Sequence, residues 1–98
     1  MDGFINSDGG DIVMEFSGSF SLNNALAVGT LYAKIDASSA VEVQRLGGVA
    51  NLVQPVHFRH RFTGIAAGRH SVGVQVQVNN ALYSITSYGN RRMEVWVE

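Results

Sequence analysis

Apolar and polar residues alternate along most of this chain with a period of two, from near residue 11 to the last residue. Such alternation is typical of strands with one buried face, because successive side chains of a strand point to opposite sides of a sheet. No helical stretch of useful length competes with it. In residues 11–20, one face of the predicted strand carries Ile12, Met14, Phe16 and Phe20.

Residues 25–36 differ, because apolar side chains occupy both faces of the segment. One face would carry Leu26, Val28 and Tyr32, and the other Ala27, Leu31 and Ile35. We predict a strand that is covered on both sides. A helix is the rival interpretation, but Val28-Gly29-Thr30 in the middle of the segment lowers helix propensity.

Three further strands are predicted over residues 41–44, 56–63 and 70–78. The first ends at Gly47-Gly48, and Pro55 fits the first position of the second, because proline cannot donate to a sheet ladder. The inward residues of the second strand are Val56, Phe58, His60 and Phe62, and those of the third are Val72, Val74, Val76 and Val78.

Two asparagines, Asn79-Asn80, follow the third of these strands. Asparagine tolerates the left-handed backbone of tight turns, so we predict an antiparallel hairpin between residues 72–78 and 82–88. The final strand, 91–98, would place Met93, Val95 and Val97 inward. Because chain ends usually fray, an apolar terminal strand is expected in the centre of a sheet.

These segments predict an all-β fold, an antiparallel, jelly-roll-like β-sandwich of about seven or eight short strands. Residues 11–98 would form the single domain, and residues 1–10 a flexible lead-in. Composition agrees with one small ordered domain: 98 residues, 46% hydrophobic, with a net charge of -1.

Charge and composition exclude several classes of function. The balance of seven basic against eight acidic residues gives no bulk reason to bind nucleic acid. No apolar stretch approaches the roughly 20 residues that span a bilayer, so no membrane insertion is expected. The absence of cysteine removes disulfides, thiolate nucleophiles and thiolate metal ligands. No cofactor is expected.

The most basic stretch is His57-Phe58-Arg59-His60-Arg61. Alternation puts Arg59 and Arg61 on one face, where they would clamp phosphates, carboxylates or acidic sugars. The competing interpretation is a solvated strand face whose charges are balanced across the sheet. The acidic residues considered for that balance are Glu42, Glu94 and Glu98.

A metal site would need the three histidines to gather. His57 and His60 point to opposite faces of one strand, and His70 is distant in sequence. A threefold axis could assemble copies of one histidine from three chains. The alternative, which we favour, is no metal, with His60 in or at the edge of the core and one of its ring nitrogens hydrogen-bonded, and with His57 and His70 exposed.

Catalytic motifs are missing from the sequence. The carboxylates lie near the termini or on outward strand positions, no Gly-x-Ser-x-Gly elbow occurs, and Gly64–Gly68 lacks the lysine of a phosphate loop. We therefore expect no enzymatic activity.

Several apolar residues fall on the outward count of their strands. They are Val13, Leu31, Tyr83, Ile85 and Trp96. One sandwich has one core, so a second buried face would need a further copy of the chain, and we expect a homo-oligomer. Ordinary scatter of single apolar residues is the alternative.

Two segments carry a resemblance. These are Phe62–Val76, FTGIAAGRHSVGVQV, and Asn90–Glu98, NRRMEVWVE. Their succession of a Phe-Thr-Gly strand end, an Ala-Gly loop, a valine strand and a terminal Arg-Arg strand resembles the C-terminal head domains of bacteriophage tail-fibre and spike proteins, which are often jelly rolls of the C1q/tumour-necrosis-factor type. The resemblance covers roughly the last 40 residues and transfers no functional residue. It implies a homotrimer in a virion that attaches to a host surface or acts as a structural cap.

The leading hypothesis is thus a non-enzymatic, trimeric structural or receptor-binding head domain, with a host cell-surface glycan or protein as candidate partner. The runner-up is a monomeric or dimeric carbohydrate-binding module, and a third is a fragment whose active site lies on a partner chain. Candidate ligand or subunit contacts are Arg59, Arg61, Tyr83, Tyr88, Arg92 and Trp96.

Overall fold

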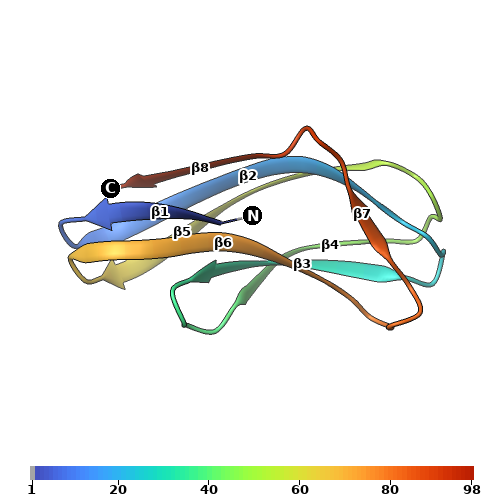
Figure 1. Ribbon diagram of the computed structural model, residues 1–98, viewed down its shortest axis with the longest axis horizontal. Helices are drawn as coiled ribbons and strands as arrows, with labels where there is room; N and C mark the ends of the chain where they lie inside the picture. Colours follow the sequence, from blue (N-terminus) through green and yellow to red (C-terminus); the bar gives the residue numbers. More distant parts are fainter. Residues whose placement is uncertain (1) are drawn as a thin grey trace.

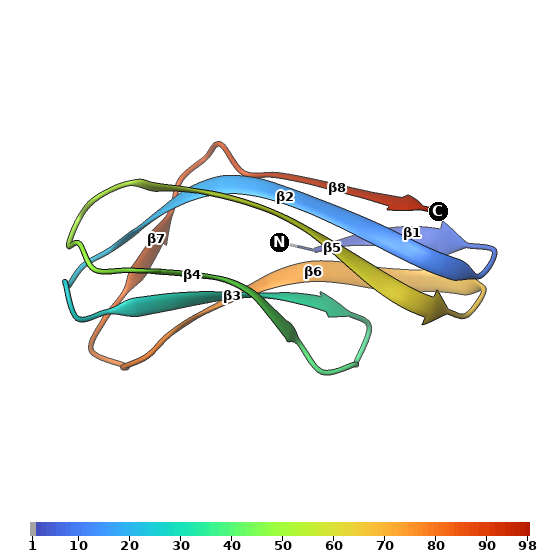
Figure 2. The same ribbon diagram turned by 180° about the vertical axis from the view of Figure 1, so that it is seen from behind.

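The computed structural model describes residues 2–98, which form two antiparallel sheets packed face to face (Figures 1 and 2). The strands are β1 (Asp2–Ser7), β2 (Gly10–Leu22), β3 (Val28–Ile35), β4 (Val41–Gly47), β5 (Gln54–Ile65), β6 (Gly68–Val78), β7 (Ile85–Ser87) and β8 (Arg92–Val97). The predicted all-β sandwich is confirmed. No helix occurs in the described part of the chain, and hence none that is long and apolar enough to cross a membrane.

The first sheet has the order β1-β6-β3-β4, and the second has β2 at its centre. One edge of β2 pairs with β5. Its other edge pairs first with β8, over Ile12–Ser17, and then with β7, over Phe20–Leu22. Strand β2 therefore organises the second sheet.

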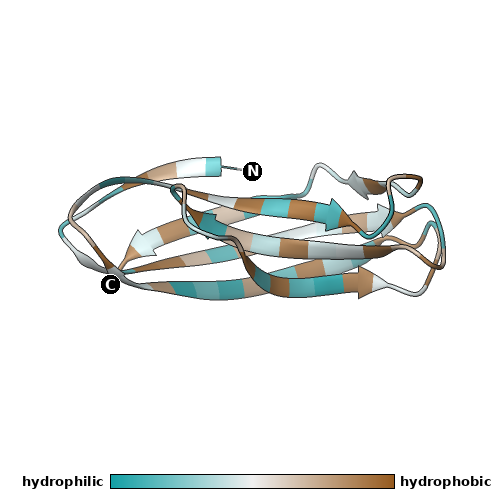
Figure 3. Ribbon diagram, turned by 90° about the horizontal axis from the view of Figure 1, so that it is seen from below, coloured by the Kyte–Doolittle hydropathy of each residue, from teal (hydrophilic) through white to brown (hydrophobic). Residues whose placement is uncertain are grey.

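The core lies between the two sheets and is filled by apolar side chains at alternating strand positions, as the sequence pattern predicts (Figure 3). The most deeply buried large side chains include Ile12, Met14, Phe16, Leu22 and Leu31. The rings of Phe16 and Phe58, from paired strands, stack with centroids 5.4 Å apart. Aromatic stacking of this kind adds to the burial of apolar area that stabilises the sandwich.

The N-terminal segment is the first departure from the sequence prediction. Residues 2–7 lay within the expected flexible lead-in, but they form β1, an edge strand that pairs with β6 from Asp2↔Gly73 to Ser7↔Gly68. Ladder hydrogen bonds with β6 hold a segment whose own sequence has little apolar character. Met1 lies outside the described residues.

Strand β3 is covered on one side only, so the prediction of burial on both faces is wrong. Leu31, Ala33 and Ile35 are buried, whereas the alternating outward residues are half-buried. Leu26 lies before the strand, in a loop, and is 73% exposed. The sandwich has only two layers, so each sheet has one covered face.

The predicted hairpin at Asn79-Asn80 is also wrong. Strand β6 pairs with β1 and β3, while β7 belongs to the other sheet and pairs with β2. The side chain of Asn80 accepts a hydrogen bond from the Leu82 amide at 2.9 Å, and the Asn80 carbonyl accepts one from the Tyr83 amide at 3.0 Å. These bonds form a turn that carries the chain across to the opposite sheet.

The terminal strand is in a sheet but not at its centre. Strand β8 pairs with β2 alone, so it lies at an edge, and Val97 is 39% exposed. The predicted inward direction of Met93 and Val95 is confirmed, since both pack against the core.

Of the five apolar residues that suggested a second buried face, Trp96 is half-buried on the outer side of β8, and the other four pack within the chain itself. Val13 points outward from β2 yet is only 1% exposed, and its register partners are Arg61 and Trp96 on the neighbouring strands. Long side chains can cover apolar surface while their polar ends stay in water. Leu31 is in the core, and Tyr83 and Ile85 pack against it. These residues therefore need no second chain to bury them.

Candidate binding surfaces

Two outward sheet surfaces hold the polar chemistry of the molecule. The first, which we name the Trp96 face, is the outer side of β2, β5 and β8. Its residues are Asp11, Val13, Glu15, His57, Arg59, Arg61, Arg92, Glu94, Trp96 and Glu98. Four of the six residues predicted as contacts lie here: Arg59, Arg61, Arg92 and Trp96.

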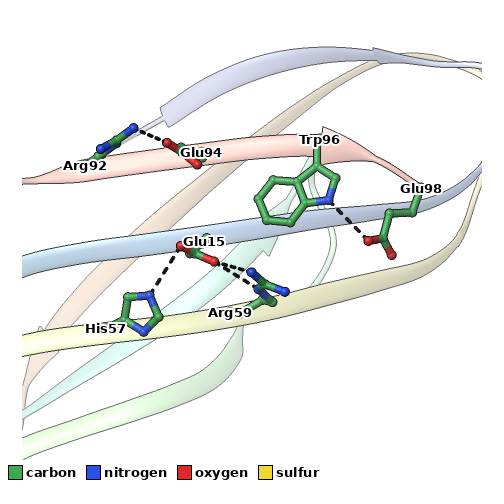
Figure 4. A network of polar contacts seen from close by, with 7 residues as sticks. All are labelled: Glu15, His57, Arg59, Arg92, Glu94, Trp96 and Glu98. Carbon is green, nitrogen blue, oxygen red and sulfur yellow. Dashed lines mark hydrogen bonds and ion pairs between the residues drawn. The ribbon is translucent and has the colours of Figure 1, made fainter.

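Glu15 is the centre of one polar network on this face (Figure 4). Its Oε2 accepts hydrogen bonds from Arg59 Nε at 3.0 Å and Arg59 Nη2 at 2.7 Å, and His57 Nε2 lies 3.5 Å from Oε1. These two partners, Arg59 first, lower the pKa of the Glu15 carboxyl. The Arg59 guanidinium also lies 5.2 Å from the centre of the Trp96 ring, which is within cation–π range.

The remaining arginines of the face are paired as well. Arg61 binds Asp11 at 3.0 Å and also Glu98, and Arg92 binds Glu94 on the same strand. The expected balance of charge is therefore present, but of the three predicted acids only Glu98 balances Arg59 or Arg61. Glu42 pairs instead with Arg45 on β4, in the other sheet, and Glu94 pairs with Arg92. The other carboxylates that balance Arg59 and Arg61, which are Glu15 and Asp11, were not predicted. Each arginine of the face already has a carboxylate partner, which an added anion would have to displace.

The three candidate aromatic residues do not form one platform. Trp96 lies on the Trp96 face, whereas Tyr83 is half-buried in the β6–β7 loop and packs against the core. Tyr88 follows β7, and its hydroxyl is 2.9 Å from Ser21 Oγ. Of the three, only the Trp96 ring is placed beside the charged network.

The three histidines also lie apart, and the described residues contain no group of three potential metal-binding side chains. His57 is exposed, as predicted. His60 lies at the edge of the core with its ring centroid 4.7 Å from that of Phe62, and burial lowers its pKa.

The prediction that His70 is exposed is wrong: its side chain is only 13% exposed. Nδ1 lies 2.6 Å from Asp36 Oδ2 and Nε2 lies 2.7 Å from the Ala66 carbonyl oxygen. Both partners are acceptors, so the ring satisfies both when it is protonated on both nitrogens. Asp36, and then Ala66, raise the pKa of His70.

The second surface is a pocket on the outer side of the other sheet, which we name the Gly73 pocket. It has a volume of about 270 Å³, and its lining residues are Asp2, Phe4, Lys34, Asp36, Ser71, Gly73 and Gln75. Gly73 is the register partner of Asp2 on β1 and of Lys34 on β3. A residue without a side chain therefore lies between an acid and an amine on neighbouring strands.

The charged groups of this pocket are less engaged than those of the Trp96 face. Within residues 2–98, the Lys34 ammonium and the Asp2 carboxylate have no ion-pair partner. Asp36 is different, because its carboxylate is hydrogen-bonded to the His70 ring and also accepts a hydrogen bond from the Ser71 amide at 2.9 Å. These two contacts, His70 first, lower the pKa of Asp36. Phe4 is 68% exposed, and the Arg69 guanidinium lies 4.3 Å from its ring centre.

The sequence does not predict this pocket, because residues 2–7 show little apolar alternation and the pairing of β6 with β1 and β3 depends on strand order. One feature pointed to it. Gly73 interrupts the polar face of the valine strand, where Gln75 and Gln77 continue the pattern. A glycine in a strand interior often marks a site of close approach.

No family model matches the chain, and no significant match was found among curated proteins or solved structures.

Proposed function

We propose that this chain is a non-enzymatic binding domain for a surface glycan, and that the Gly73 pocket holds one sugar ring. The observation that carries this proposal is the placement of Lys34 and Asp2, which have no ion-pair partner within residues 2–98, on either side of Gly73 and beside the exposed ring of Phe4. A ligand with both donors and acceptors would satisfy them without displacing an internal partner.

A sugar fits the chemistry of this lining. Its hydroxyl groups can accept from the Lys34 ammonium, donate to the Asp2 carboxylate and exchange either kind of bond with the Gln75 amide. Its C–H faces can pack on Phe4. The volume of about 270 Å³ lies just below the usual range of roughly 300–1,000 Å³ for ligand pockets, which favours a small occupant.

The proposal includes the homotrimeric head domain of a virion that the sequence resemblance implies. A shallow single-ring site binds weakly, and linking three sites in one assembly raises the overall avidity without new contacts. Glycan attachment would thus benefit from trimers. Light scattering should give a mass of three chains, and a stable monomer at micromolar concentration would contradict this part.

A glycan array, with the protein detected through a C-terminal tag, tests the binding function. For a glycan that binds, titrations with Lys34→Met and Phe4→Ala should show an affinity loss of about tenfold or more, because a charge-assisted hydrogen bond or the packing surface is lost. Gln77→Ala is the matched control, since Gln77 lies on the same face of β6 but outside the pocket. It should bind like the wild type.

Two results would contradict the proposal. Absence of binding to every glycan on the array would leave a purely structural head domain. Binding that survives the pocket substitutions but is lost in Trp96→Ala would place the glycan on the Trp96 face, where the indole lies beside Arg59.

A further inference from the structure

One end of the sandwich is formed by three loops that meet beyond the sheets, at the right of Figure 1 and the left of Figure 2. They connect β2 to β3, β4 to β5 and β6 to β7. The loops carry large apolar side chains that are 49–86% exposed. We name this surface the apolar end, and its residues are Leu26, Val49, Leu52, Val53 and Leu82.

Two of the loops have the same sequence. Asn-Asn-Ala-Leu occurs at 23–26 and again at 79–82. In each copy, the second asparagine side chain accepts a hydrogen bond from the leucine amide, at 2.8 Å in the first copy and 2.9 Å in the second. The two loops thus share one turn geometry, and their leucines, Leu26 and Leu82, are 73% and 86% exposed.

The two loops are also tied to each other in a reciprocal way. The Asn23 side chain accepts from the Ser84 amide at 2.9 Å, and the Asn79 side chain accepts from the Val28 amide at 2.8 Å. The backbone bonds Asn23 N to Ser84 O and Asn79 N to Val28 O repeat the relation. If the two loops are exchanged, Asn23 takes the place of Asn79 and Ser84 takes the place of Val28, so each bond is converted into its equivalent.

The strands on either side follow the same relation. The first loop leads from β2 in one sheet to β3 in the other, and the second leads from β6 to β7 in the opposite direction. The pairing of β3 with β6 corresponds to the pairing of β7 with β2. The end of the sandwich therefore has a local pseudo-two-fold relation that presents two equivalent leucines.

No charged side chain interrupts the segments that build this end. Residues 16–33, 46–56 and 71–90 contain no Asp, Glu, Lys or Arg. Two copies of this surface would meet without repulsion between like charges. The hydrogen bonds of the loops fix the backbone at the leucines, so little backbone freedom is lost on contact.

We propose that the apolar end binds the apolar end of a second copy of this chain, in an isologous, end-to-end dimer. The same patch on both subunits is what a two-fold interface requires. The local symmetry favours this occupant, because any contact that one leucine loop makes with the partner can be made equally by the other.

The contact between two apolar ends would be small, because five exposed apolar side chains build the surface of each copy. Small interfaces are typical of weak, transient association. We therefore expect a reversible dimer with a dissociation constant on the order of micromolar.

Sedimentation velocity over a concentration series tests the proposal. The double variant L26S/L82S should raise the dissociation constant for this contact at least tenfold, and each single variant should have an intermediate effect. Val41→Ser is the matched control, because Val41 is an exposed apolar residue of the edge strand β4, outside the apolar end and the Gly73 pocket. It should associate like the wild type.

Because the chain has no cysteine, cross-linking supplies a second readout that does not depend on affinity. L26C and L82C, treated separately with a short bis-maleimide, should each give covalent dimers. The control V41C introduces a thiol on the edge strand β4 and should stay uncrosslinked.

The outcomes separate this inference from the proposed function. If trimers form side by side, the end-to-end contact would join two of them, and L26S/L82S would halve the mass while glycan binding persists. Unchanged association of L26S/L82S would overturn the inference. So would a wild type that does not associate through this end but binds phosphatidylcholine vesicles in a leucine-dependent way, because the occupant would then be a lipid surface.

Discussion

At the scale of single residues, His70 shows best how position changes chemistry. It stands on β6 and shares the parity of the buried Val72 and Val74, so strand alternation alone points it inward, although the sequence interpretation placed it among the exposed histidines. The structure places it between Asp36 and the Ala66 carbonyl, two acceptors that come from different loops. No local pattern predicts this meeting, because Asp36 and His70 are brought together only by the pairing of β3 with β6.

The His70–Asp36 pair predicts a pH-dependent stability. The pKa of His70 is raised, so its contribution is complete below about pH 6.5 and is lost as pH rises through the folded-state pKa. The pKa of Asp36 is lowered, so its contribution is lost as pH falls below about 4. His70→Asn should therefore destabilise the protein more at pH 5 than at pH 8, as thermal unfolding will show.

His57→Asn is the control, because its side chain is exposed, and it should change the melting temperature little at either pH. The opposite pH dependence that the lowered pKa of His60 adds is present in wild type and variants alike, so it cancels in the comparison. An equal destabilisation of His70→Asn at both pH values would mean that the imidazole contributes packing rather than charge.

At the scale of the elements, the alternation predicted where most strands lie and which way they face. It succeeded for β2, β5, β6 and β8, because a half-buried strand carries its environment in its own sequence. The alternation failed where the conformation of a segment is determined by contacts with other strands. Strand β1 has few apolar residues and is held by β6, and the Asn79-Asn80 turn closes an arch between sheets instead of a hairpin.

The candidate binding surfaces show the same division. The side of the strand on which Arg59 and Arg61 lie followed from parity alone. Their partners and the Gly73 pocket depended on strand order, which a single sequence does not contain. The repeat of Asn-Asn-Ala-Leu is visible in the sequence, but its structural role depends on the pairing of β3 with β6 and of β2 with β7.

The reciprocal asparagines give a prediction for these elements. Asn23→Ala removes the bond from the Ser84 amide, and Asn79→Ala removes the equivalent bond from the Val28 amide together with a longer one, of 3.3 Å, that Asn79 donates to the Leu26 carbonyl. Each should reduce the free energy of unfolding by about 1 kcal/mol, with the larger loss for Asn79→Ala. Denaturant unfolding measures this, with Asn6→Ala on the exposed side of β1 as the control. No loss of stability in either variant would argue that the equivalent bonds do not stabilise this end of the sandwich.

At the scale of the whole molecule, the connectivity makes the sandwich a structure of distant contacts. Within the described residues, β3 and β4 are the only paired strands that are neighbours in sequence. The other ladders join segments separated by loops that must close first, and this entropy cost slows the folding of β-sandwiches.

We therefore expect refolding on a timescale of milliseconds to seconds. Stopped-flow fluorescence can follow it, since Trp96, the one tryptophan, lies on β8, which pairs with a strand far away in the chain. Submillisecond recovery of the native signal would contradict the prediction.

The position of Lys34 in the Gly73 pocket has a practical consequence for covalent chemistry. Lys34 is the one lysine of the chain, so its side chain and the α-amino group are the amines that an amine-directed reagent can modify. Because α-amino groups titrate roughly two pH units below lysine side chains, the α-amine can be blocked first near neutral pH. Labelling with an activated ester at higher pH, or immobilisation on an amine-reactive surface, would then place its adduct at the pocket. A fluorescent reporter attached to Lys34 would therefore change its emission when a ligand fills the Gly73 pocket.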